Sequence, residues 1–376
     1  RKEVYRKGKS MKYLFINSVA GYGSTGRIVA ETCRKLMSEG NECAIAWGRV
    51  KQNVDDIQTY QIGTKLDLYL HAMKTRLFDG EGFGSELATK RLVKWIEKYN
   101  PDVIWLHNLH GYYINIEILF NYIKSKNVKV IWSLHDCWSF TGHCTHFVVP
   151  QCDQWLEHCA YCCQTRRYPT CYFKGNAYEN FERKKIAFTG VKDLTIITPS
   201  KWLKKQVERG FLKEYPVEVR YNTIDTSAFC PTPSDFRDRY NLQDKKIVLG
   251  VASIWEKRKG LYDFLQLAEK INDSYKIVMV GFKKNQITNL PSNIIGISRV
   301  NSASELAQIY TAADVYLNLT YEDTYPSTNL EAQACGTPCV TYQTGGSVES
   351  VPPENVIKVG DVDGVLERIY TICNEK

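Results

Sequence analysis

The sequence alternates short apolar runs, rich in β-branched residues, with longer amphipathic segments, and it does so in two series. This pattern is typical of parallel α/β sheets, in which each strand is followed by a helix that packs on the sheet. At about 150 residues per domain, a chain of 376 residues has room for two such domains. Strands are predicted at residues 12–17, 43–47, 103–107, 128–135, 194–198 and 217–221 of the first series, and at 247–252, 275–280, 293–297, 315–319 and 339–342 of the second. Helices of the second series are predicted near 260–272, 302–312 and 326–335.

The domain boundaries follow from changes in composition. Residues 1–10 carry five basic residues and one acidic residue, and we expect a disordered leader outside the fold. The first domain is predicted over residues 11–225. Residues 226–243, with two prolines and many polar side chains, have the composition of a linker, and the second domain is predicted over 226–376. Whether its last helix, from about residue 364, crosses back to the first domain stays open.

Charge and apolar content exclude several classes of protein. The formal net charge is +8, but half of it lies in residues 1–10, so the rest is only mildly basic. This charge suits an anionic small molecule or membrane surface better than nucleic acid. The apolar runs, such as Ile247–Trp255, are far shorter than the ~18 residues of a transmembrane helix. The apolar run Tyr13–Ile16 is too short for a signal peptide, so we expect a cytoplasmic protein whose 13 cysteines are not paired in disulfides.

The most informative stretch is residues 321–338, YEDTYPSTNLEAQACGTP. Pro326 suits the first position of a helix, Gly336 suits the residue after its end, and Pro338 prevents continuation. The sequence therefore predicts a short helix directly after the strand at 315–319. The first N–H groups of a helix have no intrahelical acceptor and can bind an anion. Here these groups belong to Ser327, Thr328 and Asn329.

Two acidic residues accompany this helix. Asp323 precedes it and Glu331 lies within it, with seven residues between them. This spacing, followed by Ala and later by Gly-Thr-Pro, resembles the signature of the retaining glycosyltransferase family 4. The resemblance implies that Asp323 contacts the transferred sugar and that Glu331 binds the nucleotide ribose. Family members usually carry Glu at the first position, and because Glu322 lies one residue before Asp323, the identity of the first acid stays open.

Further segments extend the resemblance over nearly the whole chain. Gly250–Gly260 is similar to the family segment whose cations neutralise the phosphates of the donor. Lys259 takes the place of the family's lysine, and Arg258 lies beside it, but the family's usual arginine six residues earlier is Ser253 here. A solvated surface charge is the alternative interpretation of Arg258. Residues 222–225 and 345–347 are similar to the family's interdomain segment and glycine turn.

A glycine-rich segment, Gly21 to Gly26, follows the first predicted strand and precedes a helix, as in dinucleotide-binding proteins. In those proteins the second strand ends in an acid that binds the ribose, but here it ends in Ala-Trp-Gly-Arg. An NADP-dependent oxidoreductase is therefore the less favoured interpretation. By resemblance to the family's first loop, we expect the backbone at Gly21 and Gly23 to approach a phosphate or the acceptor, because glycine permits close approach.

His135 ends a predicted strand, and by resemblance it contacts the donor sugar; a buried structural histidine is the alternative. The following segment, 137–171, contains seven cysteines. Together with residues 135 and 136 it resembles a cysteine-rich insertion in a bacterial polysaccharide-synthesis branch of the family. The spacing of four of these cysteines suits a structural zinc site, and buried free thiols are the alternative. The four predicted ligands are Cys144, Cys152, Cys159 and Cys162.

Residues 164–205 contain ten basic and three acidic residues. This excess of positive charge suits anionic lipid headgroups or a lipid-diphosphate acceptor. A solvated helix face is the alternative interpretation.

The resemblance implies a GT-B fold, with two Rossmann-like domains that face each other across a cleft. The implied reaction is transfer of a sugar, with retention, from a UDP- or GDP-sugar to a glycan or polyprenyl-diphosphate-linked acceptor in bacterial capsule, exopolysaccharide or O-antigen synthesis. Lys259, Arg258 and the helix N–H groups would stabilise the departing diphosphate. Asp323 and His135 would orient the sugar, and no catalytic metal is expected. An epimerase-like enzyme and an inactive protein that binds sugar nucleotides are the alternatives.

Overall fold

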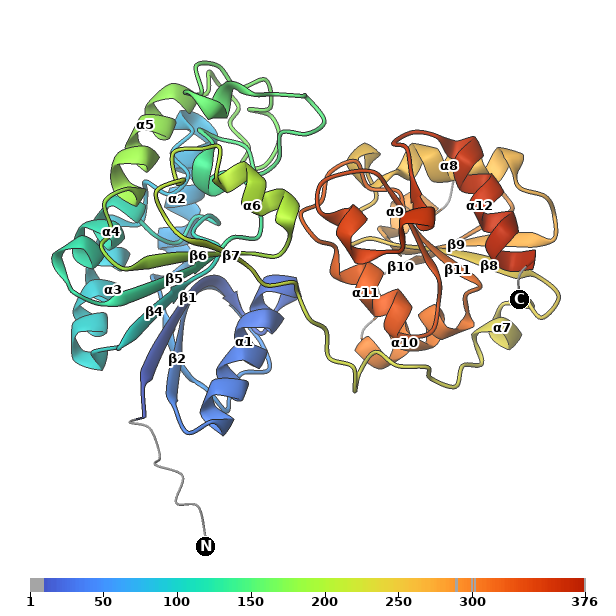
Figure 1. Ribbon diagram of the computed structural model, residues 1–376, viewed down its shortest axis with the longest axis horizontal. Coiled ribbons are helices and arrows are strands. Elements are labelled where there is room, and N and C mark those ends of the chain that lie inside the picture. Colours follow the sequence, from blue (N-terminus) through green and yellow to red (C-terminus); the bar gives the residue numbers. More distant parts are fainter. Residues whose placement is uncertain (1–9, 288–289, 299, 301, 375–376) are drawn as a thin grey trace, which may run out of the picture. The chain divides into compact units, whose positions relative to one another are not determined.

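The computed structural model describes most of the chain, and residues 1–9 of the predicted leader lie outside the described part. The chain divides into two compact units, Arg1–Arg220 and Tyr221–Lys376. Each unit contains a parallel sheet with helices on both faces (Figure 1). The described residues are 10–287, 290–298, 300 and 302–374.

The first unit contains a seven-stranded sheet in the order β3-β2-β1-β4-β5-β6-β7. Helix α1 packs on one face of this sheet, and α3, α4 and α5 pack on the other. The strands are β1 (Lys12–Ala20), β2 (Glu42–Lys51), β3 (Gln58–Gln61), β4 (Val103–Leu106), β5 (Lys129–Ser133), β6 (Leu194–Thr198) and β7 (Val217–Val219). The helices are α1 (Gly23–Ser38), α2 (Lys65–Phe78), α3 (Glu86–Tyr99), α4 (Ile116–Ser125), α5 (Ala177–Phe188) and α6 (Lys201–Val207).

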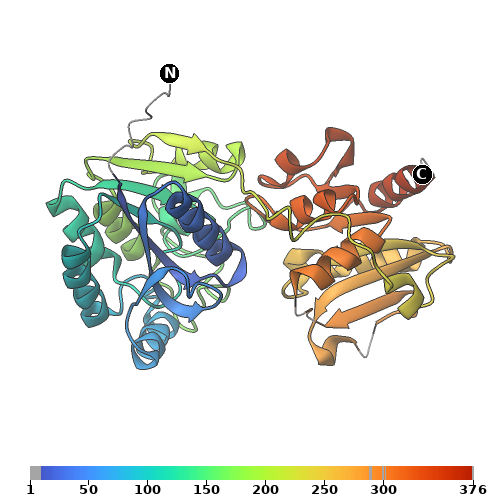
Figure 2. The same ribbon diagram turned by 90° about the horizontal axis from the view of Figure 1, so that it is seen from below.

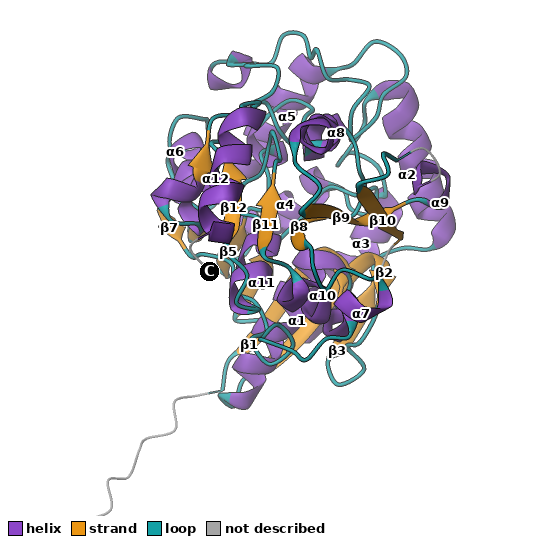
Figure 3. Cartoon of the chain, turned by 90° about the vertical axis from the view of Figure 1, so that its right-hand side faces the viewer, coloured by secondary structure: helices purple, strands orange, loops and turns teal. Residues whose placement is uncertain are grey.

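The second unit contains a six-stranded sheet in the order β10-β9-β8-β11-β12-β13. Helices α8 and α12 pack on one face, and α10 and α11 pack on the other (Figure 3). The strands are β8 (Lys246–Val251), β9 (Tyr275–Phe282), β10 (Ile294–Ser298), β11 (Val315–Asn318), β12 (Cys339–Tyr342) and β13 (Val356–Ile357). The helices are α7 (Phe236–Arg239), α8 (Leu261–Lys270), α9 (Lys284–Ile287), α10 (Ala303–Ala312), α11 (Ser327–Ala334) and α12 (Val362–Asn374).

Both sheets share the strand order of the Rossmann fold, in which the chain returns to the centre after its third strand. In the first unit the order changes direction between β1 and β4, and in the second between β8 and β11. Figure 2 shows the two sheets from a second direction. Ligands of such sheets bind at this switch point, outside the carboxyl ends of the two strands. The loops that follow β1, β4, β8 and β11 are therefore where a site is expected.

The predicted strands all appear, with shifts of one to three residues at most ends. Two short edge strands, β3 and β13, were missed because neither has a continuous apolar run. The predicted linker contains the four-residue helix α7, which buries Phe236. Helix α12 packs on α8 and buries Val365 and Ile369 in the core of the second unit.

The cysteine-rich insertion has little regular structure. Between β5 and α5 the described residues form two 3-10 turns, Trp138–Phe140 and Gln154–Leu156. Aromatic side chains pack together within it, and Phe147 stacks on Trp155 at 4.7 Å between ring centroids. In the part of the chain that the structure describes, no helix is both long and apolar enough to cross a membrane.

Candidate active site

The loop after β8 ends in a basic 3-10 turn, Lys257–Lys259, that is held against the end of β11. Tyr321 donates its backbone N–H to the carbonyl oxygen of Arg258 at 2.8 Å. Gly260, which follows the turn, has a φ of +78°, and a Cβ there would lie 2.3 Å from the carbonyl oxygen of Leu319. Only glycine fits this close approach, so Gly260 allows the basic turn to reach the switch point.

The predicted cation and the predicted acid meet at this switch point. Lys259 Nζ lies 3.0 Å from Asp323 Oδ2, and about a fifth of each side chain is exposed (22% and 20%). Of the two neighbouring acids, Asp323 makes this ion pair, and Glu322 is buried. Arg258 Nε lies 3.1 Å from Glu256 Oε1 instead. The structure therefore brings Lys259 to Asp323 and pairs Arg258 with a neighbour in its own loop.

Helix α11 begins at Ser327, one residue later than predicted, with Pro326 as its extended N-cap. Its end follows the prediction: Gly336 has a φ of +84°, and the N–H of Thr337 donates to the carbonyl oxygen of Ala332 at 3.0 Å. These are the features of a Schellman motif. Gly336 therefore determines where α11 ends.

The predicted anion-binding amides of α11 are not equivalent. Asn329 N–H already donates to the carbonyl oxygen of Pro326 at 3.3 Å, so helix geometry leaves chiefly Ser327 and Thr328 with outward N–H groups. The Asn329 side chain is fully buried. It accepts a hydrogen bond from Asn318 Nδ2 at 2.7 Å and donates one to Ser350 Oγ at 2.9 Å. This network fixes the start of α11 against β11 and against the turn at 347–350.

Glu331 is buried, with 4% of the residue exposed. The hydroxyl of Tyr310, from α10, donates to Glu331 Oε2 at 3.2 Å. The predicted glycine turn packs on the other acid, because a Cβ at Gly345 would lie 1.9 Å from the carbonyl oxygen of Asp323. The contact of Tyr310 with Glu331 has no signature in the sequence, because it joins two helices.

In the first unit, the predicted glycines lie directly after β1. Gly21 has a φ of +65°, and a Cβ there would lie 1.9 Å from the carbonyl oxygen of Gln52. Gly23 also has a φ of +65°, but a Cβ there would meet no heavy atom within 4 Å. Packing therefore accounts for Gly21, whereas the space beside Gly23 is open, as the predicted approach of a ligand requires.

His135 forms a pair with His107, which the sequence analysis did not predict. His135 Nε2 lies 2.9 Å from His107 Nδ1, and the rings stack at 5.2 Å between centroids. Burial lowers the pKa of His135 to about 4 and that of His107 well below its usual value. Both rings are therefore neutral at pH 7.

The environment of His107 decides which nitrogen of each ring carries the proton. His107 Nε2 is buried without a hydrogen-bond partner, and a buried N–H without an acceptor is rarer than an unpaired lone pair. His107 therefore carries its proton on Nδ1 and donates it to His135 Nε2. His135 must then be protonated on Nδ1, which makes this nitrogen the hydrogen-bond donor of the ring.

A third histidine nearby, His110, has a raised pKa instead of a lowered one. His110 Nε2 lies 2.8 Å from Asp136 Oδ2, and His110 Nδ1 lies 2.9 Å from the hydroxyl of Tyr168 in the insertion. Burial alone would lower the pKa of His110, but the carboxylate outweighs burial and raises that pKa. Burial also disfavours the charged form of Asp136 and would raise its pKa, but His110 lowers that pKa to about 2. The insertion is thus connected to the carboxyl ends of β4 and β5.

The structure gives no metal geometry for the predicted zinc ligands. Among the described residues, no three or more His, Cys, Asp or Glu side chains are placed to share a metal ion. Cys144 and Cys162 instead share a hydrogen bond, which lowers the pKa of Cys162 to about 6 and raises that of Cys144. Cys152 and Cys159 interact electrostatically nearby. Zinc binding therefore rests on the cysteine spacing alone.

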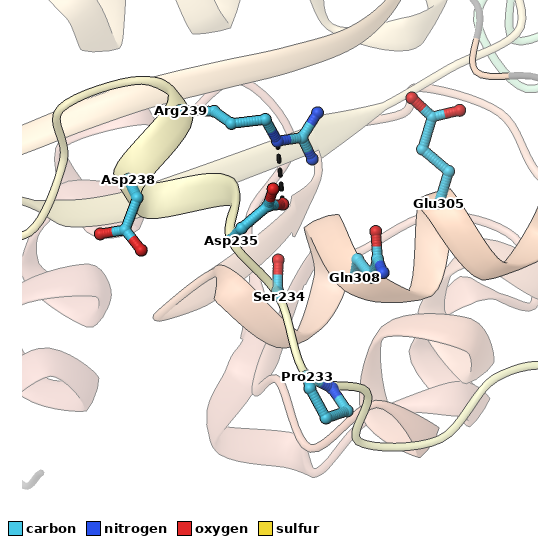
Figure 4. A pocket seen from close by; sticks show the side chains of 7 residues that line it. All are labelled: Pro233, Ser234, Asp235, Asp238, Arg239, Glu305 and Gln308. Carbon is cyan, nitrogen blue, oxygen red and sulfur yellow. Dashed lines mark hydrogen bonds and ion pairs between the residues drawn. The ribbon is translucent and has the colours of Figure 1, made fainter.

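One open pocket of the second unit lies between the linker and α10 (Figure 4). Its charged lining residues are Asp235, Asp238, Arg239 and Glu305. Arg239 is paired with Asp235 at 2.9 Å. An acidic pocket repels a diphosphate, so the predicted donor residues at the switch point remain the better site.

Comparison with known proteins agrees with this geometry. The sequence profile of Glycosyltransferase Family 4 matches residues 25–228, more than half of the chain. The chain belongs to Glycosyltransferase Family 4. The profile of Glycosyl transferases group 1 matches residues 234–376 of this family member.

Relatives of this family 4 protein include two enzymes that are named for glycolipids. A processive diacylglycerol α-glucosyltransferase of Acholeplasma laidlawii is 30% identical over 163 residues, covering 40% of this chain and 48% of that protein. An α-galactosylglucosyldiacylglycerol synthase of Streptococcus pneumoniae is 26% identical over 168 residues, covering 40% and 44%. The chain spans about half the length of these curated relatives.

Solved structures of similar fold cover nearly the whole chain. Sucrose-phosphate synthase of Thermosynechococcus elongatus has a TM-score of 0.69 at 14% identity, covering 97% of this chain and 90% of that one. HepE of Anabaena, solved with UDP-glucose, has a TM-score of 0.65 at 13% identity with the same coverage. At this identity the likeness shows the fold, which is the GT-B architecture of two Rossmann-like domains.

Proposed function

We propose that this family 4 protein transfers a sugar, with retention at the anomeric carbon, from a UDP- or GDP-sugar to a glycan or a lipid-linked glycan in bacterial surface-polysaccharide synthesis. The observation that carries the proposal is the ion pair of Lys259 and Asp323 at the switch point of the second sheet, beside the start of α11. A cation, a helix N-terminus and a carboxylate are the groups that a diphosphate linked to a sugar requires.

In this proposal the second unit binds the donor. The bond between the anomeric carbon and the β-phosphate oxygen breaks, and negative charge grows on the departing diphosphate. Lys259 and the N–H groups of Ser327 and Thr328 stabilise this charge because they are fixed before the reaction. Glu331, whose Oε2 accepts a hydrogen bond from the hydroxyl of Tyr310, binds the ribose.

Asp323 and His135 have proposed roles toward the sugar. Asp323 accepts hydrogen bonds from sugar hydroxyls, and His135 donates the proton on its Nδ1. The acceptor hydroxyl bonds to the anomeric carbon on the face that the diphosphate leaves, and its proton passes to the departing phosphate oxygen. The new glycosidic bond replaces the broken one, so no further co-reactant is needed.

The comparisons support the classes of donor and acceptor. HepE was solved with UDP-glucose, and the relative from Acholeplasma laidlawii is named for a diacylglycerol acceptor. A relative from Campylobacter jejuni, 26% identical over 120 residues, is named for a diphospho-undecaprenol acceptor. UDP-sugars and lipid-linked acceptors are therefore the first substrates to test.

Donor binding is tested by thermal shift with UDP-, GDP- and ADP-sugars, compared with the free sugars. We expect one nucleotide to raise the melting temperature of the wild type and to raise that of K259A less. Release of free nucleotide diphosphate only in the presence of an acceptor would identify transfer. An epimerase would change the sugar and leave the nucleotide sugar intact, and an inactive protein would bind without turnover; either result would overturn the proposal.

The cysteine spacing supports a separate proposal of a structural zinc at Cys144, Cys152, Cys159 and Cys162. Zinc would hold together an insertion that has little regular structure. Elemental analysis of the purified protein tests this: about one zinc per chain supports the proposal, and a metal-free, fully folded protein removes it.

A further inference from the structure

Helix α2 presents an apolar face to solvent. Leu66, Tyr69, Leu70, Met73 and Leu77 are 64%, 61%, 51%, 37% and 37% exposed. Their spacing places all five on one side of the helix. Large exposed apolar side chains that occur singly are ordinary, but a contiguous patch marks a surface that contacts something apolar.

The outward orientation of this face is fixed by the packing of the opposite side. His71 and Thr75 are buried against the unit, and His71 Nδ1 lies 2.9 Å from Ser85 Oγ. Thr64 and Asp67 form a capping box at the start of the helix. The helix therefore cannot turn its apolar face inward without losing a buried histidine contact and its cap.

Residues 172–176, which directly follow the cysteine-rich insertion and are called its tip here, continue the same surface. Tyr172 and Phe173 are exposed, and the N–H of Tyr172 donates to the carbonyl oxygen of Arg76 at 2.8 Å. The N–H of Asn176 donates to Asp79 Oδ2 at 2.8 Å. These bonds attach the tip to the carboxyl end of α2. We call the seven exposed side chains the α2 surface: Leu66, Tyr69, Leu70, Met73, Leu77, Tyr172 and Phe173.

The charges around the α2 surface are almost all positive. The segments 65–78 and 164–178 together contain six basic residues and one acidic residue. Lys65 and Arg76 flank the apolar stripe on one side and Lys74 flanks it on the other, as their helical positions require. The acid is Asp67, which already serves the cap and lies 3.5 Å from Arg91. The remaining bases are Arg166, Arg167 and Lys174.

We propose that the α2 surface docks on the interface of an anionic lipid bilayer. An amphipathic helix lying in the plane of a membrane has apolar and aromatic side chains in the acyl boundary and bases level with the headgroups, and tyrosines favour the same depth. A second copy of this chain would oppose like charges across the same face, which disfavours self-association. The inference deepens the proposed function, because a lipid-linked acceptor lies at that interface.

The experiment is flotation of the full chain with vesicles, without any sugar nucleotide. The wild type should bind phosphatidylcholine vesicles that contain phosphatidylglycerol and should bind pure phosphatidylcholine vesicles at least about tenfold more weakly, since each base near an anionic surface strengthens binding. The triple variant L66Q/L70Q/M73Q should bind at least about tenfold more weakly than the wild type. Its side chains are exposed, so its melting temperature should match that of the wild type.

The matched control is I186Q/Y262Q, which removes two equally exposed apolar side chains outside the α2 surface. This control should float like the wild type. Two results would overturn the proposal. One is that the triple variant binds the vesicles as well as the wild type does. The other is that, without lipid, the wild type is a dimer and the triple variant a monomer. Thermal shift with UDP-sugars on the triple variant separates this result from the proposed function, because donor binding resides on the second unit and should be unchanged.

Discussion

The two units share one strand order but carry opposite chemistry at their switch points. In the second unit, a lysine and a carboxylate form an ion pair beside a helix N-terminus. In the first unit, the corresponding edge carries the buried His107 and the half-buried His135, both of which are neutral at pH 7. The same backbone scaffold thus places a partly exposed ion pair at the switch point of one unit and a neutral histidine pair at that of the other.

The difference shows which property each site depends on. An anion needs positive charge that is in place before it arrives, whereas a neutral sugar needs a hydrogen-bond donor with a fixed proton. Substitutions in the second unit should therefore act directly on turnover, whereas substitutions in the first should act on stability or, through the orientation of the sugar, on turnover.

Removal of Lys259 should have the largest effect. K259A should lower kcat by about 10²–10³-fold, because one fixed donor to a developing charge contributes that much. Steady-state kinetics checks this result. K257A, in the same 3-10 turn, is the control and should retain most activity; equal losses in both variants would show that the turn acts only through its overall charge.

Removal of Asp79 should strongly destabilise the first unit. D79A leaves His143 Nδ1, now 2.5 Å from the carboxylate, and the N–H of Asn176 without their acceptor, at a cost of about 3 kcal/mol in free energy of unfolding. Urea unfolding followed by tryptophan fluorescence measures it, since seven of the eight tryptophans lie in this unit. D79N, which tolerates the φ of +55° at this position, should lose less.

The lowered pKa of His135 makes stability depend on pH. The folded pKa is about 4 and the ordinary value is 6.5, so the unfolded state binds the extra proton between these values. The stability from this neutral ring is present above pH 6.5 and is lost as the pH falls toward 4, by up to about 1.4 kcal/mol per pH unit. H135F should unfold with a shallower slope in this window, while the pair His110–Asp136 contributes equally to both proteins. An unchanged slope would contradict the assignment.

If His107 positions the proton of His135, then substitution of His107 should lower kcat. H107L removes the proton that fixes the tautomer of His135, and we expect kcat to fall about tenfold with little change in donor affinity. H107N should restore part of the loss, because its amide can donate from the position of Nδ1. If both variants behave alike, the hydrogen bond has no role beyond packing.

The smallest effect is expected at Arg258. Because its guanidinium pairs with Glu256 and is partly exposed, R258Q should cost at most about 1 kcal/mol, a few-fold in kcat. A loss as large as that of K259A would show that Arg258 leaves Glu256 and binds the phosphates. Kinetics of R258Q and E256Q together distinguishes these outcomes.

Local patterns in the sequence were sufficient for much of the fold. Pro326 and Gly336 predicted the ends of α11 to within one residue. Proline restricts the backbone φ angle and glycine widens its allowed range, whatever surrounds them. The strands β6 and β12 matched their predicted ends, since buried parallel strands are continuous apolar runs. The edge strands β3 and β13 lacked such runs and were missed.

The sequence by itself determined two α/β units and the residue types of the proposed donor site, because these depend on neighbours a few positions apart. Only the tertiary structure decided that β8 lies beside β11, which brings Lys259 to Asp323 across 64 residues. The pairs His107–His135 and Tyr310–Glu331 likewise join different elements, as does the contact between α2 and the insertion. Such contacts depend on which strands pair and which helix faces are covered, and no local propensity encodes that choice.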